Sequence, residues 1–317
     1  NSDYHPVNVG VVKEFGEILF VPNATTAPEG ELIIIDEADM KKFCLWSENG
    51  MLGAVTSVKV AGNIDMSKVA NWHTIENFPA ITFDGGSEQG YEIKNLTTPL
   101  FESLDGATIQ NLKLTGVNIT ETARLHFGSL VCDAVNTTID NCSTTGTVTY
   151  NCSTAIVGAT NTSHGVGGMI GALTGASTLK NSTNGINVTI TKYAASCDAK
   201  KYNPFGALVG YAQGTSSKHV VISNCTNLGY VLSKVKSITN VQAAAGGIAG
   251  IAHCVTLNNI TNGKEGDTTC GNVTFEQAQS CVGAAAVIGA CKNRNILISE
   301  VDCLSLCWWH YWYLVGQ

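Results

Sequence analysis

The sequence predicts an all-β protein that folds as a right-handed parallel β-helix, a solenoid with a repeat of about 39 residues and an N-terminal β/α cap. Three observations support this prediction. A glycine-apolar motif recurs at nearly constant spacing, short β-branched runs follow each copy, and helical periodicity is missing from the repeats. The motif starts at positions 128, 167, 206, 246 and 285, so its steps are 39, 39, 40 and 39 residues.

Two strand-like segments precede the repeats. Residues 7–21 alternate apolar and polar side chains, and residues 31–35 form a second apolar run. An exposed solenoid end is both an uncovered core and a template for strand addition, so it needs a cap. Residues 1–50 are therefore predicted to form N-terminal strands and a capping helix.

The capping helix is predicted to begin after Asp36. This residue is suited to an N-cap, and acidic residues crowd the first turn, as the helix dipole favours. Met40, Phe43 and Cys44 follow at helical spacing and give the helix one apolar face. That face is expected to cover the open end of the apolar interior.

Residues 51–303 are predicted to form the parallel β-helix. Each repeat holds a glycine motif such as 206–210, an Asn-centred segment such as 222–225, and an alternating run such as 146–150. A unit of this length is expected to make about two turns, a double coil. A propeller blade has a similar period, but its aromatic signature residues are absent. The glycines are expected at tight corners, since no helix follows them to form a phosphate site.

The order of several segments resembles one known family. The copy Gly206-Ala207-Leu208-Val209-Gly210 resembles the motif that names the GLUG-motif β-helix proteins of bacterial cell surfaces. The Trp72 to Ile75, Thr82 to Gly86 and Ile93 to Thr97 segments resemble, in their order, that family's entry into the helix. The resemblance covers roughly residues 31–303. It implies a surface or adhesion role, including that of large secreted adhesin-like proteins, and transfers no catalytic residue.

Composition limits the partners and the compartment. The chain has 317 residues, a net charge of −7 and only 14% charged residues, so it lacks the basic footprint of a nucleic-acid binder. No apolar run is long enough to span a membrane. The chain begins with Asn1 and without a leader, as a mature secreted form does. A secreted or cell-surface, extracellular location is expected.

Twelve Asn-x-Ser/Thr sequons are candidate glycosylation sites, and such sites carry glycan only in a host that modifies them. The candidate acceptors are Asn23, Asn95, Asn118, Asn136, Asn141, Asn151, Asn161, Asn181, Asn187, Asn224, Asn259 and Asn272.

Twelve cysteines also fit a secreted protein, and none forms a Cys-x-x-Cys zinc or redox motif. Cys142, Cys152 and Cys225 each lie inside a sequon, where alternation turns the sulfur inward. They form either a buried stack of free thiols or disulfides between neighbouring coils. Cys303 and Cys307 are the disulfide candidates near the C-terminus.

No catalytic site is predicted. Glycan-cleaving β-helices need carboxylates gathered on one face, yet Asp198 is the only acid between residues 141 and 264. Asp84 lies in an Asp-Gly-Gly turn, where a turn-forming role is expected. The seven histidines are scattered, and no metal-ligand set, cofactor site or Ser-His-Asp arrangement is found. The chain is therefore expected not to be an enzyme.

Residues 304–317 are predicted to form an aromatic C-terminal strand or cap, which either closes the last coil or makes a contact between molecules. A strand donated to the next subunit would give head-to-tail assembly. The assembly candidates at the two ends are Val9, Val11, Phe20, Trp308, Trp309, Tyr311, Trp312 and Tyr313.

These observations predict a non-enzymatic extracellular surface protein. Its structural β-helix is expected to self-associate into a fibre or to serve as an adhesin stalk, with copies of itself and host or matrix glycans or proteins as partners. The alternative is a glycan-binding or glycan-cleaving β-helix protein.

Overall fold

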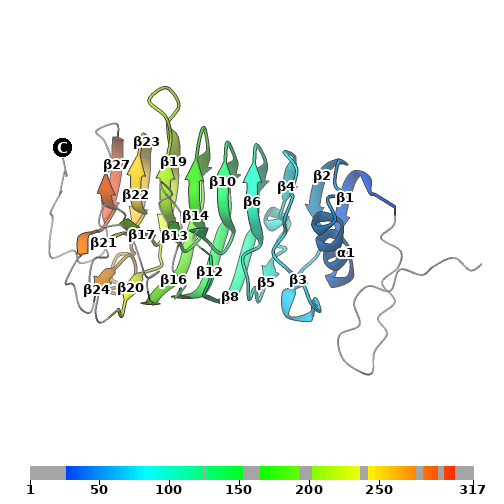
Figure 1. Cartoon of the computed structure of the whole chain (residues 1–317), viewed down its shortest axis with the longest axis horizontal. Coiled ribbons are helices and arrows are strands. Elements are labelled where there is room, and N and C mark those ends of the chain that lie inside the picture. The colour runs from blue at the N-terminus through cyan, green and yellow to red at the C-terminus, as the bar shows by residue number, and fades with distance from the viewer. Residues whose placement is uncertain are drawn as a thin grey trace, which may run out of the picture.

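The computed structural model describes residues 26–124, 126–152, 165–192, 202–235, 242–275, 281–291 and 296–303. Within these ranges the chain winds into an elongated rod of stacked coils, with helix α1 (Glu37–Glu48) at one end (Figure 1). The named strands pair in parallel throughout the three described sheets. The predicted parallel β-helix is therefore confirmed. The predicted strand at 7–21 and the tail 304–317 lie outside the described residues.

The largest described sheet, sheet A, has sixteen strands in two wings that meet at strand β19. The strands of the first wing are β1 (Glu29–Ile34), β2 (Ala54–Val60), β4 (Thr82–Asp84), β7 (Thr108–Gln110), β11 (Thr138–Asp140), β15 (Thr178–Lys180), β19 (Val220–Asn227), β23 (Val255–Asn262) and β27 (Ile296–Cys303). Those of the second wing are β3 (Ile64–Asp65), β5 (Ile93–Lys94), β8 (Lys113–Glu121), β12 (Ser143–Asn151), β16 (Thr183–Lys192), β20 (Val231–Ser233) and β24 (Val273–Phe275).

Two smaller sheets complete the described coils. Sheet B contains β6 (Phe101–Asp105), β10 (Val131–Val135), β14 (Ile170–Thr174), β18 (Val209–Gln213), β22 (Ala249–His253) and β26 (Ile288–Cys291). Sheet C contains β9 (His126–Phe127), β13 (Gly165–Gly167), β17 (Tyr202–Gly206), β21 (Gln242–Gly246) and β25 (Cys281–Ala285). Two short 3-10 helices, Met66–Lys68 and Ser87–Gln89, lie between the first strands.

Each repeat makes one turn of the solenoid, which corrects the predicted double coil. Val131 of β10 pairs with Ile170 of β14, 39 positions later, and Val209 of β18 pairs with Ala249 of β22, 40 positions later. Equivalent strands of successive repeats are thus direct neighbours. The repeat is long because one turn contains strands from sheet C, sheet B and both wings of sheet A, rather than two short turns.

The apolar interior lies between sheet B and the two wings of sheet A. One inward column runs through successive coils as Ile109, Ile139, Leu179, Ile222 and Leu257, and each of these side chains is 0% exposed. Alternation along the long strands explains this burial. In β16, for example, Ile186, Val188 and Ile190 point inward and are buried.

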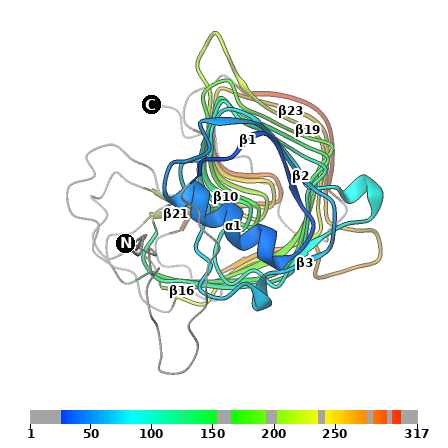
Figure 2. The ribbon, with the colours of Figure 1, turned by 90° about the vertical axis from the view of Figure 1, so that its right-hand side faces the viewer.

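Helix α1 covers the N-terminal end of this interior, as Figure 2 shows in a view along the rod. The Asp36 carboxylate caps the helix by accepting from the amides of Ala38 and Asp39 at 2.9 and 3.0 Å, which confirms the predicted N-cap. Phe43 packs against the rings of Phe78 and Phe83, with centroid distances of 6.2 and 6.0 Å. The helix thereby seals the first coil with aromatic contacts.

Sheet C lies against the outward face of sheet B, where glycines let the two layers approach closely. A Cβ added at Gly210 of β18 would lie 2.3 Å from the amide nitrogen of Val166 in β13. One added at Gly206 would lie 1.8 Å from the carbonyl oxygen of Val209, in the turn from sheet C to sheet B. The recurring glycines are therefore packing and turn residues, as the sequence predicts.

Candidate functional site

A polar cluster occupies the coils where sheet C begins. Its first member, Glu121, ends strand β8, and its side chain is 5% exposed. One carboxylate oxygen accepts from three consecutive amides, those of Thr122, Ala123 and Arg124, at 2.8, 2.7 and 2.9 Å. Burial acts to raise the pKa of Glu121, but the amides of Ala123 and Arg124 and the Arg124 guanidinium lower it below its usual value. Glu121 is thus a charged anchor for the turn into β9.

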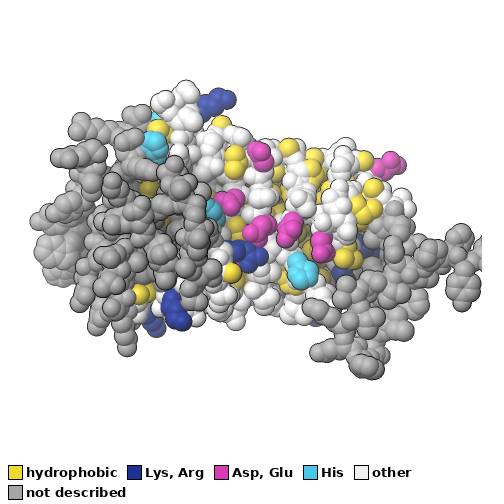
Figure 3. Space-filling model, viewed as in Figure 1, with side chains coloured by type: hydrophobic (Ala, Val, Ile, Leu, Met, Phe, Trp, Pro, Cys, Tyr) yellow, Lys and Arg dark blue, Asp and Glu magenta, His cyan; other side chains and the backbone are white. Residues whose placement is uncertain are grey.

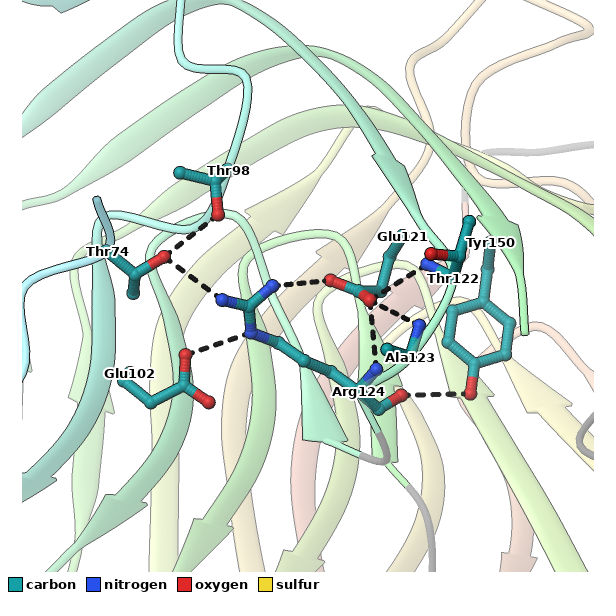
Figure 4. A network of polar contacts seen from close by, with 8 residues as sticks. All are labelled: Thr74, Thr98, Glu102, Glu121, Thr122, Ala123, Arg124 and Tyr150. Atoms are coloured by element: carbon teal, nitrogen blue, oxygen red, sulfur yellow. Dashed lines mark hydrogen bonds and ion pairs between the residues drawn. The ribbon is translucent and has the colours of Figure 1, made fainter. Parts of the chain in front are cut away.

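Arg124 links this anchor to earlier coils, as Figure 4 shows. Its Nη1 donates to Glu121 at 2.8 Å, its Nε donates to Glu102 of β6 at 2.9 Å, and its Nη2 donates to Thr74 at 3.3 Å. Thr74 shares a 2.8 Å hydroxyl contact with Thr98. Partial burial acts to lower the pKa of Arg124, yet the hydrogen bonds to Glu121 and Glu102 raise it. The guanidinium therefore stays charged and joins three successive coils.

Tyr150 closes the network from the next coil. Its hydroxyl donates to the carbonyl oxygen of Arg124 at 3.1 Å, and its ring packs against Phe205, with centroids 6.1 Å apart. The polar cluster is thus connected to the apolar interior.

Beside the network lie two groups with weaker pairing. His126 of β9 and Asp133 of β10 approach to 3.6 Å between Nδ1 and Oδ1, with side chains 20% and 45% exposed. Burial raises the pKa of Asp133, an effect that His126 opposes and the nearby Glu102 reinforces. Burial and the charge of Glu102 likewise raise the pKa of the buried Cys132 thiol, which is therefore not a thiolate nucleophile.

Several acidic side chains gather on one face of the rod, near His and a basic side chain (Figure 3). The carboxylates of Glu102 and Asp133 are partly exposed, whereas that of Glu121 is buried, and Arg124 pairs with both Glu102 and Glu121. The arrangement can hold adjacent coils rigidly and present acidic groups to a partner. In the described part of the chain, no three His, Cys, Asp or Glu gather to hold a metal ion.

The structure separates the sequon asparagines by position. Six lie at left-handed corners between strands: Asn95, Asn136, Asn141, Asn181, Asn224 and Asn259. Asn118 and Asn187 lie within β8 and β16. Asn151 ends β12 with a buried, unpartnered Oδ1, and Asn272 donates its amide to the Thr268 carbonyl. Asn23 and Asn161 lie outside the described residues, so all twelve sites remain predictions.

The three cysteines that the sequence predicts in the interior are free thiols. Cys142, Cys152 and Cys225 are buried and unpaired, so the disulfide alternative is wrong for them. The coil of Ser182 separates Cys142 from Cys225, and this places the two sulfurs two coils apart. The side chains of Cys303 and Cys307 lie outside the described part, as do all the assembly candidates.

Sequence reasoning missed the polar cluster. Glu121, Arg124 and Asp133 are spread over coils whose alignment only the fold provides. One signal was present: Arg124 and Arg294 are the two arginines of the chain, and a lone Arg beside strand ends is suited to bidentate pairing with carboxylates. Asp84 has its predicted turn role, since it accepts from the Gly86 amide at 2.9 Å.

Comparisons with known proteins find similarity to immunoglobulin A1 proteases. A family described as the M26 IgA1-specific metallo-endopeptidase N-terminal region matches residues 56–146. An immunoglobulin A1 protease of Streptococcus sanguinis is 26% identical over 212 residues, which cover 59% of this chain and 11% of that protein. The crystal structure of a candidate immunoglobulin A1 protease from Bacteroides ovatus has a TM-score of 0.48 and 16% identity, covering 86% of this chain and 84% of that one.

These similarities overturn the family and function predicted from sequence. The resemblance to GLUG-motif surface proteins is wrong, because the family that matches is a peptidase region. The non-enzymatic filament or adhesin stalk, its glycan-active alternative and the expectation of no enzyme fall with it. The family prediction failed because the glycine-apolar repeats are required by the close packing of sheet C on sheet B. Any solenoid with two sheets packed in this way requires such glycines.

The expected extracellular location agrees with these relatives. No helix in the described ranges is long and apolar enough to cross a membrane.

The chain spans about a tenth of the length of the curated protease that it matches, with 11% of that protein covered. Residues 56–146 of this chain are similar to the N-terminal region of M26 IgA1-specific metallo-endopeptidases.

Proposed function

We propose that this chain is the β-helical part of an extracellular protease similar to the IgA1-specific metallo-endopeptidases, and that its N-terminal coils hold the protein substrate. One observation carries the proposal. The family match, residues 56–146, falls on the coils that contain Thr74, Glu102 and Arg124 together with the His126–Asp133 pair. The matched segment and the polar cluster are thus the same part of the solenoid.

Rigidity suits these coils to substrate holding. A protease gains rate by keeping a peptide bond in fixed geometry, and Arg124 ties three coils together through Glu121, Glu102 and Thr74. The partly exposed carboxylates of Glu102 and Asp133 lie on the coils that these contacts join. Charged groups on such a rim set partner selection and association rate.

The residues do not fit a catalytic metal centre in the described coils. No His of the chain is followed by Glu, so the His-Glu-x-x-His zinc motif is absent from the sequence. The described residues also bring together no metal-binding group. The proposed role of this chain within the protease is therefore engagement of the substrate, and no bond-breaking step is assigned to its residues.

Binding to immunoglobulin A1 tests the proposal directly. The purified 317-residue chain is immobilised, and immunoglobulin A1 is passed over it at increasing concentration. Saturable binding is expected. The double variant Glu102→Gln with Asp133→Asn is expected to weaken it roughly fivefold, about 1 kcal/mol. Asp140→Asn is the matched control, because its carboxylate is 28% exposed on sheet A, in the matched segment but away from the cluster.

Absence of binding to immunoglobulin A1 would overturn the proposal. Equal weakening by the Asp140→Asn control would instead remove the polar cluster from it. The same protein is also incubated with immunoglobulin A1, with and without a metal chelator. Gel analysis then shows whether immunoglobulin A1 is cleaved. The chain alone is expected to bind immunoglobulin A1 without cleaving it. Cleavage that the chelator abolishes would contradict the proposal that these coils only hold the substrate.

For the location, we propose that the protein is secreted rather than attached to the cell surface.

A further inference from the structure

The sequon asparagines of the described coils differ in what their side-chain amides do. At the corners, each asparagine has a left-handed φ between 49° and 62°. Each donates its Nδ2 hydrogen to a side chain one coil earlier, at 2.8 to 3.4 Å. The donor and acceptor pairs are Asn95 with Asp65, Asn136 with Asp105, Asn141 with Asn111, Asn181 with Asp140, Asn224 with Asn181, and Asn259 with Asn224.

The fold explains why these corners read as sequons. In Asn181-Ser182-Thr183, the asparagine adopts the left-handed corner that few other residues tolerate. Ser182 then points inward and is 1% exposed, and Thr183 begins strand β16 as a β-branched, outward residue. The corner geometry alone therefore favours an Asn-x-Thr pattern, whether or not a glycan is attached.

Asn118 and Asn187 are placed differently. Both lie within long strands of the second wing of sheet A, at positions that alternate with buried Ile119 and Val188. Asn118 is exposed and only accepts, from the Thr147 hydroxyl at 3.4 Å. Neither Nδ2 donates a hydrogen bond to the described residues. Asn118 is exposed to solvent, and Asn187 is partly exposed.

The two strand asparagines are not direct neighbours on this face. Asn118 pairs in register with Thr147, which in turn pairs with Asn187. The two asparagines are therefore two coils apart, about 10 Å. Corner neighbours such as Asn181 and Asn224 are one coil apart, about 4.8 Å, and are joined by their amides.

We propose that Asn118 and Asn187 are acceptors of N-linked glycan, and that the six corner asparagines carry none in the folded chain. In the transfer, Nδ2 of asparagine attacks C1 of a lipid-pyrophosphate-linked oligosaccharide. The N–C1 bond forms and the bond from C1 to the pyrophosphate oxygen breaks. The lipid pyrophosphate leaves with the bonding electron pair, and one amide proton passes to a base of the transferase.

A sugar at a corner conflicts with the stacking of coils. The Asn181 side chain contacts Asp140 of the coil before it and Asn224 of the coil after it, so a ring on its Nδ2 would meet one of these two side chains. Where transfer precedes folding, a chain modified at a corner cannot close its ladder and leaves the folded fraction. This inference rests on the amide geometry alone and does not depend on the proposed protease function.

The test is secretion of the full chain from a eukaryotic cell line. The monomeric fraction from size exclusion is treated with a peptide N-glycosidase in ¹⁸O-water, which converts each glycosylated asparagine to labelled aspartate. Peptide mass spectrometry is expected to find the label at Asn118 and Asn187, with unlabelled Asn141, Asn181 and Asn224. Label at the corners of the monomeric, folded chain would overturn the proposal, as would an unlabelled pair Asn118 and Asn187.

Single substitutions of the third sequon residue test the same proposal by intact mass, which does not require every peptide to be detected. Thr120→Ala and Thr189→Ala each remove one sequon without touching its asparagine. Each is expected to lower the intact mass by one glycan. Thr226→Val, the matched control, removes the corner sequon of Asn224 and is expected to leave the glycan mass unchanged. A loss of glycan in Thr226→Val, with circular dichroism still showing a β fold, would contradict the inference.

Discussion

The side-chain amide of Asn224 donates to Asn181 across one coil at 3.0 Å, and both residues hold a left-handed φ of 52°. The contact joins equivalent corners of two successive repeats. It combines the two properties that make asparagine suitable there, namely tolerance of the left-handed region and an amide that both donates and accepts. The ladder fixes the stacking of the coils along one edge of the rod.

Breaking this ladder should destabilise the solenoid. Asn181→Ala removes both amide contacts and places a Cβ-bearing residue without a local hydrogen bond in the left-handed region. We expect the free energy of unfolding to fall by about 2 kcal/mol. Asn181→Gly keeps the backbone unstrained and should cost only about 1 kcal/mol. Denaturant titration followed by circular dichroism measures both, and Asn187→Ala on the flat face is the control. Equal effects at Asn181 and Asn187 would show that the ladder adds nothing.

The last corner offers a stabilising substitution. Glu300 follows Asn259 in the same column and holds a φ of 52°, which a glutamate side chain does not support. Glu300→Asn should raise the free energy of unfolding by about 1 kcal/mol. Thermal unfolding at constant pH measures the gain. Glu300→Ala keeps the strain and should give no increase, so a similar gain from alanine would refute the explanation.

The contact between sheets B and C should not tolerate a methyl group. Gly210→Ala would place its Cβ 2.3 Å from the Val166 amide nitrogen, and the three nearest atoms all belong to the backbone. We expect a loss of about 1 to 3 kcal/mol in the free energy of unfolding. Gly53→Ala is the control, since no atom lies within 4 Å of its added Cβ, and it should change stability by less than about 0.5 kcal/mol. If Gly210→Ala leaves the free energy of unfolding unchanged, the two sheets can move apart to accept the methyl group.

Acid should loosen the coils through Glu121. Because the folded pKa of Glu121 lies below its unfolded value near 4.5, its contribution is fully present above that pH and is lost as the pH falls further. The Glu121→Gln variant should therefore be less stable at pH 7, by about 1 to 2 kcal/mol, yet lose less stability between pH 5 and 3. Thermal midpoints across that range measure the effect. An unchanged acid slope in Glu121→Gln, compared with the exposed Glu88→Gln control, would remove Glu121 as the titrating group.

The buried thiols should be chemically silent in the folded protein. Burial raises the pKa of Cys142 and of Cys225 to about 12, and both side chains are at most 2% exposed. A maleimide at pH 8 is expected to label neither residue until denaturant is added. Mass spectrometry of labelled peptides, with the denatured chain as the positive control, checks this. Rapid labelling of the native chain would indicate that the coils open on that timescale.

Much of the solenoid can be predicted from local pattern. Period-two alternation places Val188 and Ile190 inside, and the capping role of Asp36 follows from side-chain chemistry near a helix start. The number of turns per repeat could not be predicted, because one long turn and two short turns bury the same alternating residues. The register between Val131 and Ile170 decides it, and that register is a long-range property.

The candidate site is less accessible to sequence reasoning. Thr74, Glu102 and Arg124 are separated by dozens of residues and belong to three coils of different length. Their convergence depends on how many residues each coil consumes, which short motifs do not encode. The family assignment failed for a related reason, since glycine corners in a solenoid are set by sterics and recur without shared ancestry.

Because one repeat is one turn, the rod grows slowly as the chain grows. Each added repeat of about 39 residues extends the rod by a single strand spacing, about 4.8 Å. From β9 onward the described turns contain strands of the same three sheets, so a gene segment of one repeat can be duplicated or deleted there as a single turn, provided that α1 still covers the first coil. The distance between the capping helix and any given surface can therefore be adjusted in steps of one strand while the cross-section stays constant.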